Sequence, residues 1–200
     1  MRFLSSASRL RLKNSKLLVL DVDGVMTDAS LLFVEGTGWT RAFSVKDGYG
    51  LRLLMGPGFE VALLSGGDSK SVRERSRFLG VQHAYFGNSN KLDPFNELLK
   101  ITKCTPEDVV YIGDDLFDLD VLRLVGFSVT VPSAVPEVKA AVDYITHEIG
   151  GHGAVRELAD LIRHAKGLNN LDLHAVSRGI NASILSATPK STSAVIADKE

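Results

Sequence analysis

The chain has 200 residues, enough for one domain with a small insertion. Its 23 basic and 24 acidic residues give a formal net charge of −1, which excludes a general nucleic-acid binder, since that needs an excess of lysine and arginine. The single cysteine, Cys104, excludes an intramolecular disulfide and a multi-cysteine zinc site. No stretch reaches the roughly 18 apolar residues of a membrane-spanning helix, and the start lacks an apolar secretory segment. These features predict a cytoplasmic protein without nucleic-acid or membrane partners.

Both ends of the chain differ in composition from the part between them. Residues 1–15 are basic and contain no acid, and we interpret them as a disordered lead-in, with a targeting segment as the alternative. Residues 167–200 are rich in small polar residues and predict a weakly ordered tail, with a short helix near 171–177. The domain itself is therefore expected at 16–166.

Apolar runs of strand length alternate with segments of helical spacing along the middle of the chain. The predicted strands are 16–21, 59–65, 82–86, 109–112 and 127–131. The predicted helices are 47–55, 68–79 (capped by Asp68 or Ser69), 91–103, 116–125, 136–142 and 153–165. Two β-like runs around the glycines of 35–38 predict a hairpin inserted at 30–44. The pattern predicts an α/β fold: a Rossmann-like parallel sheet with helices on both faces and a small β-hairpin insertion after the first strand.

Reactive side chains gather where the predicted strands end, and ligands bind at that edge of such sheets. The first strand ends in Asp21-Val-Asp23, the second ends in Ser65, Lys91 opens a helix, and a later strand runs into GDDLFD at 113–118. Asp21 and Asp23 are two residues apart and can share a face, where their charges repel. A hard cation that takes oxygen ligands resolves this repulsion, and Mg²⁺ is the natural choice.

The other residues at this edge of the sheet are suited to bind a phosphate group. Ser65, Lys91 and the backbone N–H groups of Gly66 and Gly67, which precede a helix, are donors suited to phosphoryl oxygens. A carboxylate beside Mg²⁺ can attack phosphorus and form an aspartyl-phosphate. Asp23 is then placed to protonate the leaving oxygen and later to activate water. The sequence therefore predicts a Mg²⁺-dependent phosphomonoesterase.

Four motifs, found in order within 16–166, resemble those of the haloacid dehalogenase superfamily of phosphotransferases. They are DVDGV at 21–25, a hydroxyl at Ser65, Lys91, and GDDxxD at 113–118. The resemblance implies that Asp21 is the nucleophile and Asp23 the general acid and base. It also implies a metal site made of Asp21, Asp23 through its backbone carbonyl, and Asp114, with Asp118 as an outer acid.

A narrower resemblance starts from the short hairpin that stands in place of a cap domain. The matching stretches are DVDGVMTD at 21–28, FSVKDGYG at 43–50, SNK at 89–91, YIGDDLFD at 111–118 and GGHGAVRE at 150–157. They are similar to the minimal-cap family of 3-deoxy-D-manno-octulosonate 8-phosphate phosphatases, which serve lipopolysaccharide biosynthesis. This resemblance implies a homotetramer built through the 30–44 hairpins, in which a neighbouring subunit covers each active site. It implies a sugar-phosphate site lined by Ser44, Val45, Lys46, Asp47, Gly48, Arg52 and Arg75.

Two positions depart from that family's pattern. Gly67 stands where the family usually has an arginine after Thr-Gly, and His152 replaces the arginine of GGRG. Since the first of these arginines is implicated in binding the acidic sugar, a phosphatase for a nine-carbon sugar-acid 9-phosphate stays open as an alternative. A second alternative is a non-catalytic oligomerisation module of sugar-nucleotide metabolism, which would be expected to lose Asp21 or Lys91, and neither is lost. A phospho-receiver has the motifs in a different order.

Overall fold

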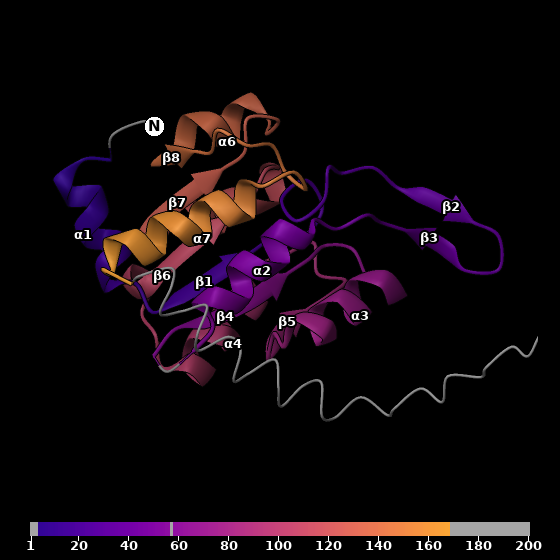
Figure 1. Ribbon diagram of the computed structural model, residues 1–200, viewed down its shortest axis with the longest axis horizontal. Coiled ribbons are helices and arrows are strands. Elements are labelled where there is room, and N and C mark those ends of the chain that lie inside the picture. Colours follow the sequence, from indigo (N-terminus) through magenta and orange to yellow (C-terminus); the bar gives the residue numbers. More distant parts are fainter. Residues whose placement is uncertain (1–3, 57, 169–200) are drawn as a thin grey trace, which may run out of the picture. The chain divides into compact units, whose positions relative to one another are not determined.

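A six-stranded parallel sheet forms the centre of the computed structural model, which describes residues 4–56 and 58–168 (Figure 1). The strands lie in the order β5-β4-β1-β6-β7-β8. Their bounds are β1 Leu17–Leu20, β4 Glu60–Leu64, β5 His83–Tyr85, β6 Val109–Ile112, β7 Phe127–Thr130 and β8 Tyr144–Ile145. A separate antiparallel hairpin joins β2 (Leu32–Val34) to β3 (Gly38–Thr40). The predicted α/β class and the inserted hairpin are both confirmed.

Helices cover both faces of the sheet. Their bounds are α1 Ser6–Asn14, α2 Val45–Leu54, α3 Lys70–Leu79, α4 Leu92–Thr102, α5 Leu119–Leu122, α6 Pro136–Ala141 and α7 Ala154–Ala165, with 3₁₀ turns η1 Pro106–Asp108 and η2 Leu116–Asp118. The chain moves outward through β4 and β5 on one side of β1 and through β6, β7 and β8 on the other. Because such crossovers are right-handed, α2 and α3 cover one face while α5 and α6 cover the other. Helix α7 packs along α2, in front of the sheet in Figure 1.

The position of the central strands fixes where the acidic loops emerge. All four residues of β1 and all four of β6 are buried, as expected for strands covered on both faces. Leu20 at the end of β1 pairs with Leu63 of β4 on one side and with Ile112 of β6 on the other. The residues that follow β1, β4 and β6 therefore leave the sheet side by side, at the middle of its carboxyl edge.

Serine caps start the two helices that follow these loops on one face. The Ser44 hydroxyl accepts the first-turn N–H of α2, and the Ser69 hydroxyl accepts that of α3. Of the two predicted caps for α3, Ser69 is correct, and Asp68 pairs with Arg73 instead. Helix α3 ends at Gly80, whose φ of 81° suits glycine.

The beginning of the chain corrects one prediction. Residues 6–14 form helix α1, where the sequence suggested a disordered lead-in. Leu12 of this helix is fully buried, and the Arg11 guanidinium binds both carboxylate oxygens of Asp143, at 2.8 and 3.0 Å. Contacts with α7 and β7 thus fold α1 onto the domain, although its composition is typical of a solvated segment.

Smaller differences concern length. Strand β8 has only two residues and carries no periodicity that the sequence could reveal. The helix predicted at 116–125 is divided into η2 and the short α5. Most of the tail predicted at 167–200, with its helix near 171–177, lies outside the described residues. Among the helices that the structure does describe, none has the length and apolar character needed to cross a membrane.

Candidate active site

A pocket of about 350 Å³ lies at the carboxyl edge of the sheet. Its lining includes Asp21 and Asp23 after β1, Gly66 after β4, Lys91 before α4 and Asp114 after β6. The structure therefore brings together side chains that the sequence places at four separate strand ends and helix starts.

The centre of the pocket is a buried lysine between two carboxylates. Lys91 Nζ lies 2.7 Å from Asp21 Oδ1 and 2.6 Å from Asp118 Oδ1, and all three side chains are at most 9% exposed. Burial alone would lower the pKa of Lys91, but the two carboxylates raise it above its usual value. Lys91 therefore stays charged and brings a fixed positive charge to Asp21.

Asp118 holds Lys91 in place through a buried network of hydrogen bonds. Its Oδ1 also accepts the Tyr111 hydroxyl at 2.6 Å, and its Oδ2 accepts the backbone N–H groups of Asp114 (2.9 Å) and Asp115 (3.2 Å). Each carboxylate oxygen thus accepts two hydrogen bonds, so that neither has a lone pair left for another ligand. We therefore interpret Asp118 as a residue that orients Lys91 and the loop after β6, and not as a metal ligand.

Asp21 and Asp114 fit a magnesium ion. A carboxylate oxygen of Asp21 and one of Asp114 lie within 4.8 Å of each other, and oxygen donors are the ligands that Mg²⁺ prefers. Burial, reinforced by the charge of Asp118, raises the pKa values of Asp21 and Asp114 to about 7 each. A divalent cation between the two carboxylates would favour their ionised forms and so offset the free energy needed to keep both charged in a buried site.

The loop after β1 is shaped to receive Asp114. Gly24 has a φ of 86°, and a Cβ at this position would overlap the Asp114 carboxylate. Only glycine allows both this backbone conformation and the close approach. The DVDGV motif therefore supplies acids and also leaves room for a third acid from another strand.

One residue of the predicted phosphate-binding turn, Ser65, is buried and does not line the pocket. Gly66 and Gly67 line the pocket, but Ser65 is 1% exposed. Its hydroxyl donates to the Gly67 carbonyl at 2.9 Å and accepts the Gly67 N–H at 3.2 Å. Ser65 therefore shapes the turn in this structure, and its contact with phosphate stays a prediction.

Arg41, which the sequence analysis did not single out, contacts the pocket residue Asp23. Arg41 follows β3 by one residue and forms an ion pair with the Asp23 carboxylate. The only signal in the sequence is its place on the returning arm of the hairpin, which leads back to the sheet. Nothing local distinguishes it from a solvated surface arginine.

The residues predicted to bind the sugar do not line this pocket within one chain. Arg75 instead donates to the Ser44 carbonyl at 2.8 Å and lies over the rings of Phe43 and Phe78. Arg52 donates to the Phe78 carbonyl and stacks on the same ring. A Cβ at Gly48 would collide with the Arg75 guanidinium, so Gly48 belongs to this second cluster, between α2 and α3.

Asp47, also predicted to bind the sugar, connects two helices. It is 1% exposed and accepts the backbone N–H groups of Gly153 (3.2 Å) and Arg156 (2.7 Å) at the start of α7. Its neighbour Val45 is 81% exposed. Asp47 therefore caps α7 from α2, while Val45 is open to another molecule.

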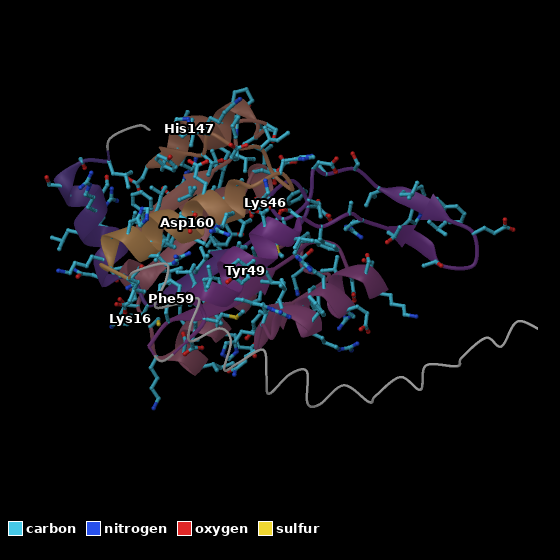
Figure 2. All side chains as sticks on the ribbon, viewed as in Figure 1. Lys16, Lys46, Tyr49, Phe59, His147 and Asp160 are labelled. Atoms are coloured by element: carbon cyan, nitrogen blue, oxygen red, sulfur yellow. The ribbon has the colours of Figure 1, made fainter. Side chains whose placement is uncertain are left out.

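Lys46 lines a second cavity, of about 530 Å³, near the start of α2 and along α7. Three of its lining residues, Lys46, His147 and Asp160, are labelled in Figure 2. His152, the departure from the family's GGRG pattern, lies there as well. The cavity mixes acids and bases and lacks the buried lysine of the first pocket.

Buried carboxylates, a charged lysine and a glycine-rich turn around one pocket suit the binding and transfer of a phosphoryl group. The fold and the site together define a phosphatase. A family model for haloacid dehalogenase-like hydrolases matches residues 80–158. The 3-deoxy-D-manno-octulosonate 8-phosphate phosphatase of Salmonella typhi is 44% identical over 155 residues, which are 78% of this chain and 82% of that protein. The chain belongs to the haloacid dehalogenase-like hydrolases, in the family of 3-deoxy-D-manno-octulosonate 8-phosphate phosphatases.

Solved structures agree with this assignment. The phosphatase of Yersinia pestis superposes with a TM-score of 0.79 at 41% identity, covering 82% of this chain and 89% of the other. The enzyme of Moraxella catarrhalis, solved with a magnesium ion, a phosphate ion and a KDO molecule, gives a TM-score of 0.80 at 35% identity, covering 88% and 99%. The predicted family and the predicted phosphatase class are both confirmed.

Proposed function

We propose that this phosphatase hydrolyses 3-deoxy-D-manno-octulosonate 8-phosphate through an aspartyl-phosphate intermediate. The observation that carries the proposal is the buried 2.7 Å contact between Lys91 Nζ and Asp21 Oδ1 inside the pocket. A fixed lysine charge favours the ionised, nucleophilic form of the carboxylate and attracts a phosphate. The names of the relatives and the KDO molecule in the Moraxella catarrhalis structure support the choice of sugar.

In the first step, an oxygen of Asp21 attacks phosphorus and the bond from phosphorus to the sugar oxygen breaks. Asp23 lies on the same loop and faces the pocket, so we assign to it the proton that the leaving oxygen takes up. Lys91, Ser65 and the Gly66 N–H balance the charge on the phosphoryl oxygens. The products are the free sugar acid and a phosphorylated Asp21.

In the second step, Asp23 accepts a proton from water while the water oxygen attacks phosphorus. The bond between Asp21 and phosphorus breaks, inorganic phosphate leaves and the free carboxylate returns. The residues that would hold Mg²⁺ are Asp21, Asp114 and the backbone carbonyl of Asp23. When bound, the ion adds positive charge beside the phosphoryl oxygens.

Removal of the metal is expected to abolish turnover. We predict that a chelator lowers phosphate release to background, because the acids that would hold the ion then repel the substrate. The assay measures phosphate release from a panel of sugar phosphates, which includes the eight-carbon substrate and nine-carbon acid-sugar 9-phosphates. Restoration of the rate by added Mg²⁺, with an unchanged circular dichroism spectrum, shows that the chelator did not unfold the protein.

The pattern across the panel decides between the proposed function and its alternatives. Preference for the eight-carbon acid supports the proposal and means that Gly67 is tolerated. Preference for a nine-carbon 9-phosphate keeps the chemistry and contradicts the substrate. No release from any member, in folded protein supplied with Mg²⁺, favours the non-catalytic oligomerisation module.

A homotetramer built through the hairpins is part of the same proposal. Leu31, Leu32, Phe33 and Trp39 are each more than half exposed, an unusual density of apolar surface on one short hairpin. The ring centroids of Phe33 and Trp39 lie 5.2 Å apart, edge to face, and form a compact apolar surface. Contact between hairpins of neighbouring subunits would bury this surface.

Such an assembly also gives a role to the predicted sugar-binding residues that do not line the pocket of their own chain. Ser44, Val45, Lys46, Arg52 and Arg75 would then face the active site of a neighbouring subunit, while the buried Asp47 and Gly48 would hold α2 in place for them. A cytoplasmic location completes the proposal, and cell fractionation tests it.

Replacement of Trp39 by serine is expected to dissociate the assembly. The change removes the largest apolar side chain of the hairpin without altering a buried residue, so light scattering should show a smaller species. Ile101→Ser is the matched control, because Ile101 is 52% exposed on α4, outside the hairpin. A monodisperse wild-type monomer with full activity would refute the tetramer.

A further inference from the structure

The Asp23 carboxylate is held by a guanidinium that comes from the hairpin. Arg41 Nε lies 2.5 Å from Asp23 Oδ1 and Arg41 Nη2 lies 2.8 Å from Oδ2, which makes a two-pronged pair. The third nitrogen, Nη1, donates to the Ser69 hydroxyl at 2.9 Å. With every nitrogen engaged and only 7% of its side chain exposed, Arg41 is fixed in one orientation.

The absence of a side chain at Gly67 makes room for this pair. A Cβ at position 67 would lie 2.9 Å from Arg41 Nη2 and 3.0 Å from Asp23 Oδ2. The φ of Gly67 lies outside the left-handed region, so its backbone conformation does not by itself require glycine. The close approach of the guanidinium does favour glycine here.

Asp23 depends on Arg41 for its orientation. Within residues 4–56 and 58–168, no side-chain hydrogen bond or ion pair to the Asp23 carboxylate is seen other than those from Arg41. The Asp23 side chain is 34% exposed and lines the pocket, whereas Asp21 is held in the buried network of Lys91. Without Arg41, the Asp23 carboxylate would be free to rotate toward solvent.

We propose that Arg41 is a positioning residue, which holds the Asp23 carboxylate toward the leaving oxygen of the substrate, and that Gly67 is the position that admits it. The inference rests on the proposed function, in which Asp23 serves the leaving oxygen. A two-pronged contact fixes the plane of a carboxylate, and small displacements of a reacting group cost about 10²-fold in rate. The hairpin then does more than present apolar surface, because its returning arm completes the catalytic site.

The test compares two leaving groups in the variant Arg41→Gln. A sugar oxygen is a poor leaving group that needs the proton from Asp23, whereas p-nitrophenolate leaves without one. The comparison uses kcat/KM, which reports the steps up to loss of the leaving group, because hydrolysis of phosphorylated Asp21 also uses Asp23 and is common to both substrates. We expect kcat/KM for the sugar phosphate to fall about 10²-fold, and kcat/KM for p-nitrophenyl phosphate to fall much less. Gly67→Ala should reproduce this split, because its methyl group pushes the guanidinium away from Asp23. Arg41→Lys should recover only part of the loss, since a lysine cannot form the two-pronged contact.

Arg73→Gln is the matched control, because Arg73 forms an exposed ion pair with Asp68, next to Gly67 in sequence. It should leave both rates unchanged. Equal losses on both phosphates in Arg41→Gln would make Arg41 a purely structural residue, and an unchanged sugar-phosphate rate would contradict the positioning role. A wild-type protein that hydrolyses neither phosphate would overturn the proposed function itself. A wild-type protein active on p-nitrophenyl phosphate alone would contradict only the sugar substrate.

Discussion

Asp21→Asn is expected to lower steady-state phosphate release by about 10⁵-fold or more, the scale seen when a covalent nucleophile is removed. An amide cannot form the aspartyl-phosphate, and uncatalysed hydrolysis of phosphate monoesters is among the slowest reactions known. The remaining groups of the pocket can bind the substrate, but none of them can replace Asp21 as the nucleophile that attacks phosphorus. Phosphate release under saturating substrate and Mg²⁺ measures the effect.

The variant should stay folded, which separates a chemical loss from a structural one. Asparagine has nearly the shape of aspartate, and Lys91 keeps its 2.6 Å contact with Asp118. The matched control is Asp120→Asn, an exposed aspartate on α5, which should retain wild-type activity. Appreciable steady-state turnover by Asp21→Asn would show that another group attacks phosphorus.

The sequence predicts the sheet well because its strands are covered on both faces. Residues 109–112 are an uninterrupted apolar run in the sequence and form β6 with the same bounds. The acids after β1 and β6 can then be placed at one edge, since parallel strands end together. This explains why Asp21, Asp23, Lys91 and Asp114 meet in one pocket, as expected.

The sequence did not predict the roles of Arg41 and Tyr111, because neither the distance along the chain nor the apolar pattern indicates their hydrogen-bond partners. Arg41 and Asp23 are 18 positions apart, and their contact depends on the path of the hairpin. Tyr111 reads as one apolar residue of a buried strand, yet its hydroxyl reaches Asp118. A periodic pattern reports burial, but it does not say which polar atom finds which partner.

The sugar-binding predictions show a further limit. They come from a resemblance, and the geometry of one chain places Arg75 against Ser44 and Asp47 against α7, outside the pocket. Residues that serve a neighbouring subunit need not lie near their own active site. Their assignment therefore depends on the assembly, which the sequence of one chain cannot specify.

Asp118→Ala is expected to lower the free energy of unfolding by about 3–5 kcal/mol, the cost of breaking a buried ion pair. Asp118 is 1% exposed and accepts donors from Lys91, Tyr111 and two backbone N–H groups. Alanine leaves the Tyr111 hydroxyl and both N–H groups unpaired, and each unpaired group adds to the cost. Urea-induced unfolding, followed by circular dichroism, measures the change.

Activity should fall together with stability, because the freed Lys91 would no longer be held against Asp21. The comparison Tyr111→Phe removes one donor and leaves the lysine pair intact, so it should cost only about 1 kcal/mol. Asp120→Ala, at an exposed site, should change neither stability nor rate. If Asp118→Ala unfolds at the same urea concentration as the wild type, then the network does not stabilise the fold. In that case Lys91 must be held in place by Asp21 alone, and the loop after β6 must keep its shape without the two contacts to Asp118.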